Sequence, residues 1–465
     1  MTPSNAAGLA IGRVRVAALR ARRWIGVAPV PARRTGRPAG FRTRLPLWPL
    51  YALFGLMPLW WLLGGLHLLW PGGGLLLGVV LLSRGRVRLP VGAGLWLVLL
   101  SIVVISVVRL DRVSGLPMFV LRFGFLATAL IVYLYVYTAA RDGVAWRRLC
   151  APLALYWLGM IAVGWIGVVK PTFAITTPTE IALPDAIVGN RGLRALVHSH
   201  ATEYNPLSRS PYYRTAAPYP YTNNWGTAFA VLTPCMMAYL SSVRTGALRT
   251  AVLVSLPFAL VPAFMTLNRG MFIGLGAGLL YLALRALLRG DVRLILSLAA
   301  VAVLIWIATL LIPVGELISN RVNNTDSTTD RADLYVQTLQ AVWRSPLLGY
   351  GGPRMVDTTH ATEPLGTQGQ LWLIIYSYGI PALLILIAFL ALVAWRSAAA
   401  VSAPGKWLSA VPVIALVITP FYGYTDVNLS LMFFAFALAV AALDGPINRP
   451  PALSRRSVSR ATAVG

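Results

Sequence analysis

The chain has 465 residues, of which 57% are hydrophobic and only 12% are charged, and its mean hydropathy is +0.71. A water-soluble domain of this composition would lack the polar surface that it must present to solvent, so the composition excludes that class and favours a membrane protein. The formal charge of +26 does not indicate a nucleic-acid-binding protein, because the basic residues recur at the ends of apolar runs instead of gathering on one polar domain.

The chain opens with a basic segment. Residues 1–44 hold ten arginines and no acidic residue, and no apolar run among them is long enough for a signal peptide. We expect this segment to be a cytoplasmic arm that lies on anionic lipid headgroups. A similar basic tail, residues 446–465, follows the last apolar run.

Apolar runs of membrane-spanning length follow the basic arm. A helix needs about 20 apolar residues to cross the hydrocarbon core, and the sequence predicts an all-α, polytopic transmembrane bundle of about 12 spans. Only Gly64 and Gly65 separate the first two runs, and merging these runs would leave eleven. The twelve runs are residues 46–64, 66–83, 91–109, 117–139, 149–169, 226–243, 250–267, 271–288, 293–314, 370–395, 407–424 and 427–445.

The basic residues predict the orientation of these helices. Lys and Arg concentrate in the cytoplasmic loops of membrane proteins. With a cytoplasmic N-terminus, 27 of the 40 Lys and Arg residues fall in cytoplasmic segments, together with only three acidic residues. We therefore expect a multi-pass protein of the cell (plasma or inner) membrane with both termini in the cytoplasm.

Two connections are too long to be simple links between helices. In the predicted topology both are extracytoplasmic, and together they hold three of the four histidines and most of the acidic residues. Polar loops on a rigid scaffold are a common location for a functional site. The predicted divisions are the arm (1–44), spans 1–5 (45–169), the first large loop (170–225), spans 6–9 (226–314), the second large loop (315–369), spans 10–12 (370–445) and the tail (446–465).

Sequence motifs for nucleotide, metal and thiol chemistry are absent. The sequence has no GxGxxG, Walker A, HExxH or CxxC pattern. Cys150 and Cys235 fall within apolar runs, where we interpret them as packing residues. We therefore expect no cofactor, no metal and no nucleic-acid partner.

The first large loop combines arginines with an aromatic run. Guanidinium groups match phosphate oxygens and stay charged at any relevant pH. Tyr219, Tyr221 and Trp225 lie just after the arginines and suit either sugar stacking or an aromatic belt at the membrane interface. The polar residues of the loop include Arg191, Arg194, His198, His200, Glu203, Arg209 and Arg214.

Two further arginines lie at or near the outer ends of predicted spans. Arg269, in the turn Asn268-Arg269-Gly270, is held at the outer interface, where it either binds an anion together with a helix N-terminus or snorkels toward the headgroups. Arg122 lies a short way inside the fourth span, where an arginine is costly unless it is paired, functional or snorkelling outward.

The second large loop begins with an amphipathic helix and ends in polar residues. Arg331 and Tyr335 lie at the start of the helix, where Arg331 is either an anion ligand or a plain surface charge. His360, Glu363 and Gln368 follow, just before the tenth span. These three residues are the candidates for catalysis.

The order of these features resembles the O-antigen ligase and polymerase family, whose members act on glycans linked to polyprenyl diphosphate. The features are a basic loop before Asn223 and Asn224, the Arg-Gly turn at Arg269, Arg331-x-x-x-Tyr335, a Pro-Leu-x-Gly-x-Gly segment and a polar motif entering the tenth span. They cover about residues 190–390 and are short, but their order and shared outer placement are fairly specific. The resemblance implies a GT-C-like fold and a metal-independent glycosyltransferase.

The resemblance also implies roles for individual residues. Arg269 matches the arginine of the family's Ser-Arg-Gly turn, with Asn268 in place of the serine, and Arg331 matches the arginine that opens the large-loop helix. Arg214 is the choice for the basic residue before the Asn-containing turn, with Arg209 and Arg191 as alternatives. Together with Arg122, these arginines are the candidates for binding the diphosphate.

One departure from the family concerns the general base. The family commonly has a His-Asn pair about eleven residues before the glycine of the next span, and this chain has Gln368-Gly369 before Gly379. His360 could replace the missing histidine if the loop folds back, and Glu363 and Glu203 are alternatives.

The implied reaction moves a glycan from a polyprenyl-diphosphate carrier to a hydroxyl of a glycan, lipid or wall-polymer acceptor, in cell-surface polysaccharide assembly. Fixed arginines would stabilise the departing diphosphate, and Tyr219, Tyr221, Trp225 and Tyr335 would contact the glycan. The main alternative is a transporter or flippase, although such proteins usually place polar groups near mid-bilayer. A scaffold or sensor of cell-wall assembly is a third possibility, and the sequence does not separate ligase from polymerase.

Overall fold

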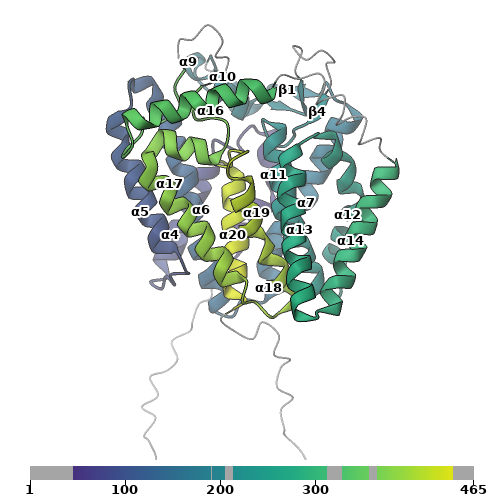
Figure 1. Ribbon diagram of the computed structural model, residues 1–465. Helices are drawn as coiled ribbons and strands as arrows, with labels where there is room; N and C mark the ends of the chain where they lie inside the picture. Colours follow the sequence, from purple (N-terminus) through teal and green to yellow (C-terminus); the bar gives the residue numbers. More distant parts are fainter. Residues whose placement is uncertain (1–44, 190, 205–212, 312–326, 356–363, 444–465) are drawn as a thin grey trace, which may run out of the picture. The chain divides into compact units, whose positions relative to one another are not determined.

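The computed structural model describes residues 45–189, 191–204, 213–311, 327–355 and 364–443, and within them leaves out the side chains of residues 186–187, 191, 308–311 and 327–332. The described residues form a bundle of roughly parallel helices, with short helices and strands gathered at one end (Figure 1). The predicted helical class is thus confirmed. The sequence did not predict two short antiparallel strand pairs at that end.

Five helices among the described residues are long and apolar enough to cross a membrane. They lie within or around predicted spans four, five, seven, eight and ten. The number twelve stays a prediction, because other apolar helices in the described segments are shorter. The five are α6 (Leu116–Arg141), α7 (Trp146–Val169), α12 (Ala247–Met265), α13 (Arg269–Arg289) and α17 (Gln370–Ser397).

The remaining helices of the bundle show where prolines and glycines interrupt apolar runs. The first predicted run divides into three short pieces, and Pro49 and Pro58 each lie at the start of one of them, where the missing proline amide costs no helical hydrogen bond. The elements are α2 (Trp48–Leu50), the π-helix η2 (Tyr51–Gly55), α3 (Met57–Leu62), α4 (Trp70–Ser83), α5 (Ala93–Ile105), α11 (Thr222–Ser242), α14 (Val292–Leu311), α18 (Ala403–Leu408), α19 (Ala410–Ile418) and α20 (Val427–Ala441).

Helix α20 lies at the centre of the bundle and is buried along its whole length (Figure 1). It packs against α6, α11, α17, α18 and α19. Because protein surrounds it, α20 carries polar side chains with partners from other helices, such as Ser430, whose Oγ accepts a hydrogen bond from Trp70 Nε1 at 2.9 Å. Phe433 stacks on Phe389 of α17, with ring centroids 5.1 Å apart.

Large aliphatic side chains cover much of the outside of the bundle. Leu284 and Leu288 of α13 are exposed, as are Val303 and Ile307 of α14. Exposed apolar residues over several helices are what a bundle surrounded by lipid tails requires.

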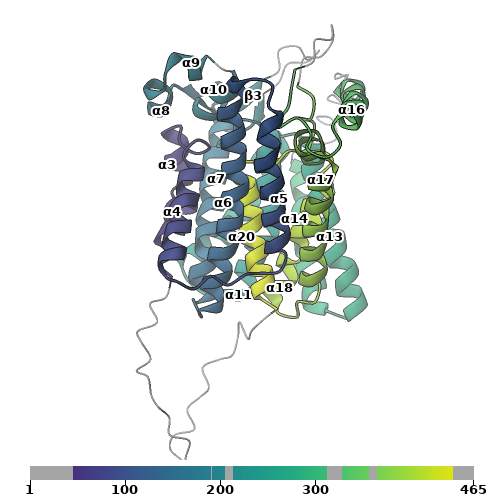
Figure 2. The same ribbon diagram turned by 90° about the vertical axis from the view of Figure 1, so that its left-hand side faces the viewer.

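The polar end of the bundle is built from the two large loops. Helix α16 (Ser327–Arg344) lies across this end in Figure 1 and is seen end-on in Figure 2. The first loop adds three short helices and two strand pairs, β1 with β2 and β3 with β4. The smaller elements are η3 (Ser106–Arg109), η4 (Val113–Gly115), β1 (Ala174–Ile175), α8 (Pro178–Ala182), α9 (Asp185–Val188), α10 (Arg191–Val197), β2 (Ser199–His200), β3 (Thr202–Tyr204) and β4 (Tyr213–Thr215).

Helix α17 changes direction at Gly379 (Figure 1). Gly379 has a φ of 86°, which side-chain-bearing residues rarely adopt, and a Cβ there would lie 2.4 Å from the carbonyl oxygen of Leu347. Pro381 follows and has no amide hydrogen to continue the helical pattern. The bend therefore brings the first half of α17 against the second large loop.

Candidate functional site

The turn between α12 and α13 places Arg269 as the first residue of α13. Asn268 caps this helix, because its side-chain oxygen accepts a hydrogen bond from the amide of Met271 at 3.0 Å. The amide of Asn268 donates to Thr266 Oγ1 at 3.2 Å, and Leu267 adopts a positive φ of 50°. Asparagine thus does the capping that a serine could also do at this position.

On one side, the turn packs against the N-terminus of α11. Asn268 Nδ2 lies 3.4 Å from the carbonyl oxygen of Thr222 and 3.3 Å from that of Asn223. A Cβ on Gly226 would lie 2.3 Å from Asn268 Nδ2, so the close approach of the turn to α11 requires glycine there.

On the other side, the turn contacts Tyr422, in the segment between α19 and α20. The amide of Gly270 donates to the hydroxyl of Tyr422 at 3.0 Å. A Cβ on Gly270 would lie 1.7 Å from a ring carbon of Tyr422. The glycine after Arg269 therefore allows this tyrosine to pack against the turn.

Arg214 reaches the same turn from strand β4. Its Nε donates to the carbonyl oxygen of Thr266 at 2.9 Å, and its Nη1 lies 3.6 Å from Glu203 Oε1, on the opposite residue of β3. Glu203 Oε2 in turn accepts a hydrogen bond from the amide of Thr222 at 2.9 Å, at the N-terminus of α11. The structure thus joins Arg214, Glu203 and the Arg269 turn into one cluster.

Two guanidinium nitrogens at this turn are buried without a partner. Within the described parts of the chain, neither Arg214 Nη2 nor Arg269 Nε has a hydrogen-bond acceptor. Buried donors are nearly always paired in folded proteins, because leaving one unpaired costs free energy. Two such donors beside one turn point to an anionic ligand that would complete the site.

The polar motif at the start of α17 joins the same region. The amide of Gln370 donates to the carbonyl oxygen of Tyr422 at 3.0 Å, and its side chain bonds to Thr425 Oγ1 at 2.6 Å and to the amide of Tyr424 at 3.0 Å. Gln368, two residues earlier, is buried, and its Nε2 donates to Thr367 Oγ1 at 3.2 Å. Residues 420–426 therefore connect the start of α17 with the Arg269 turn.

A buried acidic residue, Asp426, lies at the end of this connecting segment and caps α20. Its Oδ1 accepts from the amide of Asn428 at 2.7 Å, and its Oδ2 accepts from the side chain of Asn224. Burial raises the pKa of Asp426 to about 7, although the hydrogen bonds from Asn428 and Asn224 act in the opposite direction. The sequence analysis did not select Asp426, and the available signal was an acidic residue between two apolar runs.

A comparison with known protein families gives a match that includes the Arg269 turn. Residues 252–380 match the family model described as O-antigen ligase. This part of the chain is therefore similar to the O-antigen ligase family. The matched range includes Arg269, Arg331 and Gln368, whereas Arg214 and Asp426 lie outside it. No curated protein sequence matches the chain.

The aromatic residues predicted to contact a glycan lie in different surroundings. Tyr219 and Trp225 are buried, so their rings are not surface platforms for a sugar. The Tyr219 hydroxyl lies 2.7 Å from that of Tyr156. Tyr221 is 49% exposed. Tyr335 of α16 stacks on Trp372 of α17 at 4.4 Å between ring centroids.

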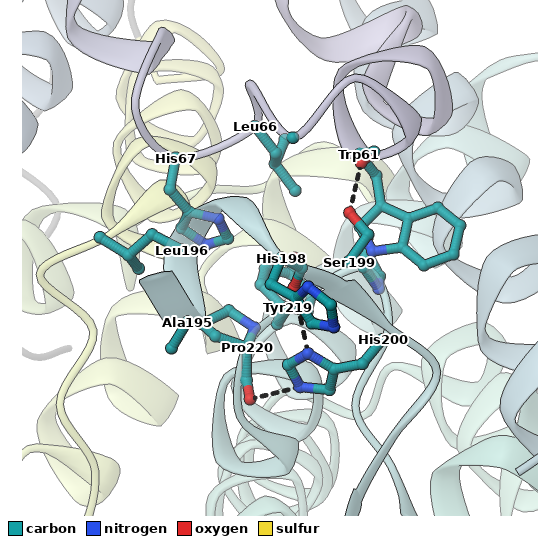
Figure 3. A pocket seen from close by; sticks show the side chains of 12 residues that line it. Trp61, Leu66, His67, Ala195, Leu196, His198, Ser199, His200, Tyr219 and Pro220 are labelled. Carbon is teal, nitrogen blue, oxygen red and sulfur yellow. Dashed lines mark hydrogen bonds between the residues drawn. The ribbon is translucent and has the colours of Figure 1, made fainter. Parts of the chain in front are cut away.

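A small pocket lies between the first loop and the connection from α3 to α4 (Figure 3). It encloses about 240 Å³ and is lined by His67, His198 and His200, among others. His198 Nδ1 bonds to Glu180 Oε2 at 2.8 Å, and the ring nitrogens of His200 bond to backbone carbonyl oxygens of His198 and Pro220, each at 3.1 Å. In the described segments no group of three or more His, Cys, Asp or Glu residues could hold a metal.

The structure does not place the other predicted site residues in the cluster around the Arg269 turn. Arg122 lines a separate, larger cavity. Arg191 and Arg331 lie in α10 and α16, but their side chains are outside the described set. His360, Glu363 and Arg209 lie outside the described residues altogether.

Proposed function

We propose that this O-antigen ligase-like membrane protein is a glycosyltransferase that moves a glycan from a polyprenyl-diphosphate carrier to an acceptor hydroxyl on the outer face of the membrane. The family match and the helical bundle support a role in cell-surface polysaccharide assembly. One observation above all supports a substrate with a diphosphate group. Among the described residues, a guanidinium nitrogen of Arg214 and one of Arg269 are buried without a hydrogen-bond acceptor.

In the proposed reaction, the acceptor hydroxyl oxygen forms a bond to the anomeric carbon of the glycan. The bond from that carbon to the diphosphate oxygen breaks, and its electron pair leaves with the diphosphate. Arg214 and Arg269 stabilise the negative charge that grows on this leaving group more strongly in the transition state than in the ground state. In this proposal the guanidinium groups supply the positive charge, so no metal is needed.

A base must take the proton of the acceptor hydroxyl. Glu203 is a weak choice, because one carboxylate oxygen accepts from the Thr222 amide and the other lies near Arg214, so both are already engaged. Gln368 has a neutral side-chain amide, which can orient a hydroxyl by hydrogen bonding but cannot take its proton. We therefore assign the base to His360 or Glu363.

Helix α16 carries Arg331, and contacts with α17 position this helix. Arg331 lies one helical turn before Tyr335, about 6 Å along the helix axis at 1.5 Å per residue. Tyr335 stacks on Trp372, whose indole nitrogen donates to the carbonyl oxygen of Pro420 at 3.1 Å. The helix that carries Arg331 is thus anchored to the segment that also contacts the Arg269 turn, which supports a shared role in binding the diphosphate.

Complementation of a gene deletion tests the proposed function. We expect Arg269→Ala and Arg331→Ala each to lower glycan transfer by about 100-fold or more, the usual loss when one group that stabilises transition-state charge is removed. Surface glycan, lipid-linked donor and the amount of membrane-inserted protein would be measured. Arg86→Ala is the matched control, because Arg86 is exposed and lies in the connection between α4 and α5.

The same experiment separates an enzyme from a transporter. Loss of a transferase leaves the lipid-linked donor in the outer leaflet, where an added glycosidase can reach it. Loss of a flippase leaves the donor on the cytoplasmic side, protected from that glycosidase. Full complementation by both variants, or a protected donor in the deletion strain, would contradict the proposed function.

A further inference from the structure

A large cavity lies at the polar end of α6, where η4 leads into the helix. Its volume is about 1090 Å³, part of which is open to solvent. It lies between residues 110–122, which include the start of α6, and residues 350–355 of the second large loop. The charged residues that line it are Asp111, Arg112, Arg122 and Arg354. Arg214 and Arg269 are not among the described residues that line this cavity.

Arg354 and Asp111 neutralise each other in the cavity wall. Arg354 Nη1 lies 2.7 Å from Asp111 Oδ2, and Nη2 donates to the carbonyl oxygens of Arg109 at 2.5 Å and Tyr350 at 3.2 Å. The guanidinium group also lies over the Tyr350 ring, 4.5 Å from its centroid. Arg354 is therefore held in place by protein groups, and the acidic side chain of Asp111 is already paired.

The loop wall of the cavity is fixed to the bend of α17. The amide of Tyr350 donates to the carbonyl oxygen of Tyr376 at 3.0 Å, and that of Gly351 donates to Ser377 at 2.8 Å. Gly351 has a φ of 73°, and a Cβ there would lie 3.0 Å from the carbonyl oxygen of Ser106. The loop wall of the cavity is thus hydrogen-bonded to α17 and lies close to η3, which follows α5.

Arg122 supplies a cation to the wall of this cavity. Among the described residues its guanidinium group forms no ion pair with an acidic side chain, and the Tyr378 hydroxyl is an ionisable group close enough to interact with it electrostatically. A Cβ on Gly352 would lie 3.2 Å from Arg122 Nη1, so the side chain lies against the backbone of the cavity wall. An arginine within a membrane helix is costly when it is unpaired, and Arg112 adds a second positive charge at the same cavity.

The wall of the cavity and the segment beside the Arg269 turn are hydrogen-bonded to different residues of the first half of α17. Gln370 bonds to the segment beside the Arg269 turn, whereas Tyr376 and Ser377 bond to the wall of the cavity. The helical rise of 1.5 Å per residue separates these points by about 10 Å. The described residues therefore form two cationic centres at the polar end, and a short glycan could extend from one to the other.

We propose that this cavity is a second phosphate-binding site, and that it takes the phosphate group of a lipid-linked acceptor. Leu110, Met118 and Met355 line the cavity beside the arginines, and this pairing of apolar groups with cations suits a phosphate attached to a lipid chain. The residues that line the cavity support binding of a lipid phosphate. That this lipid is the acceptor of the glycan rests on the proposed function. An acceptor of this class would itself be carried on a phosphorylated lipid.

Calorimetric titration of the purified full-length protein in detergent tests the site, with farnesyl diphosphate as the probe. We expect the wild type to bind two equivalents. Arg122→Gln should weaken one of them by about ten-fold or more, because it removes charge-assisted hydrogen bonds. Arg269→Gln should weaken the other equivalent, and the double variant should bind neither tightly. Arg86→Gln is the control and should keep both.

Two further variants and probes sharpen the result. Arg122→Lys keeps the charge and should bind more tightly than Arg122→Gln, which separates loss of the cation from loss of the fold. Inorganic pyrophosphate should bind the cavity about ten-fold more weakly than farnesyl diphosphate does, because it lacks the apolar chain. Equal binding of both probes at this site would overturn the assignment to a lipid-linked phosphate in favour of a free anion.

The outcomes distinguish the two proposals. Two equivalents retained by Arg122→Gln would overturn the cavity site and leave the proposed function standing. One equivalent lost in Arg122→Gln, with none lost in Arg269→Gln, would support the cavity as a phosphate site and overturn the donor position assigned in the proposed function.

Discussion

Asn268 and Gly270 determine where Arg269 lies. The asparagine side chain caps α13 and also contacts the backbone of α11, so one residue both starts a helix and joins it to its neighbour. The glycine leaves room for Tyr422, whose hydroxyl accepts the Gly270 amide. Arg269 thus needs no side-chain hydrogen bond of its own to be held at the turn, and its donors remain available for a ligand.

Asp426 is a residue-scale source of pH dependence. Its pKa is raised by burial from 3.8 to about 7. Between these values the folded protein holds a proton that the unfolded chain has released, so the stability of the fold falls as the pH rises through this window. Above about pH 7 the full cost of burying the charged carboxylate is present.

We predict that Asp426→Asn raises the thermal stability of the protein relative to wild type at about pH 8, by an amount on the order of a few kcal/mol, and that this advantage shrinks at about pH 4.5. Asparagine keeps an oxygen that can accept from Asn224 and from the Asn428 amide, but it is never charged. Thermal unfolding in detergent at both pH values would measure the difference. An advantage that does not change with pH would show that Asp426 does not titrate as stated.

At the scale of elements, α16 and the first half of α17 pack together at the polar end of the bundle, where both cationic centres lie. The stacked rings of Tyr335 and Trp372 join the two helices, and Leu334 packs with Leu365 and Tyr376 in a small apolar cluster. Such a cluster is small compared with the core around α20. The position of α16 therefore depends on few contacts.

We predict that Tyr335→Ala loosens α16 from α17 and lowers glycan transfer, with a loss of about 1 kcal/mol from the aromatic pair. Tyr335→Phe keeps the stacked ring and should retain most of the activity. Hydrogen exchange of the α16 amides would report the loosening directly. Val336→Ala is the control, because Val336 is adjacent in α16 and 54% exposed. Unchanged exchange in Tyr335→Ala would show that the stack does not hold α16.

At the scale of the whole molecule, the distribution of charge predicts the orientation of the helix bundle. The basic loops and the end with α16 lie at opposite ends of the long helices, as the connection Arg84–Arg88 and helix α16 illustrate (Figure 1). If Lys and Arg mark the cytoplasmic side, the candidate site faces outward. That is the side on which the proposed reaction takes place.

Cysteine labelling in intact cells tests the orientation. A membrane-impermeant maleimide should label Thr172→Cys, in the first large loop, and should label Ser83→Cys only after the membrane is made permeable. Both positions are exposed, and the native residues Cys150 and Cys235 are buried, so background labelling should be low. The reverse pattern would place the candidate site in the cytoplasm and exclude the proposed reaction there.

The sequence by itself determined those features that depend on residues close together in the chain. Apolar runs predicted a helical membrane protein, because the length of a run sets whether a helix can cross the bilayer. The Asn-Arg-Gly turn was predicted between two such runs, and the structure places Arg269 there as the first residue of α13. The order of short motifs identified the O-antigen ligase family, which the match over residues 252–380 confirms.

Only the tertiary structure decided which distant residues meet. Gly270 and Tyr422 are 152 residues apart in the chain, and their contact depends on how α13 and α19 pack. In the same way, Arg214 reaches the Arg269 turn, Arg122 lines a separate cavity and Tyr219 is buried. An apolar run has the same local pattern whether protein or lipid surrounds it, so the sequence could not show that α20 is the centre of the bundle or that Asp426 is buried at its end.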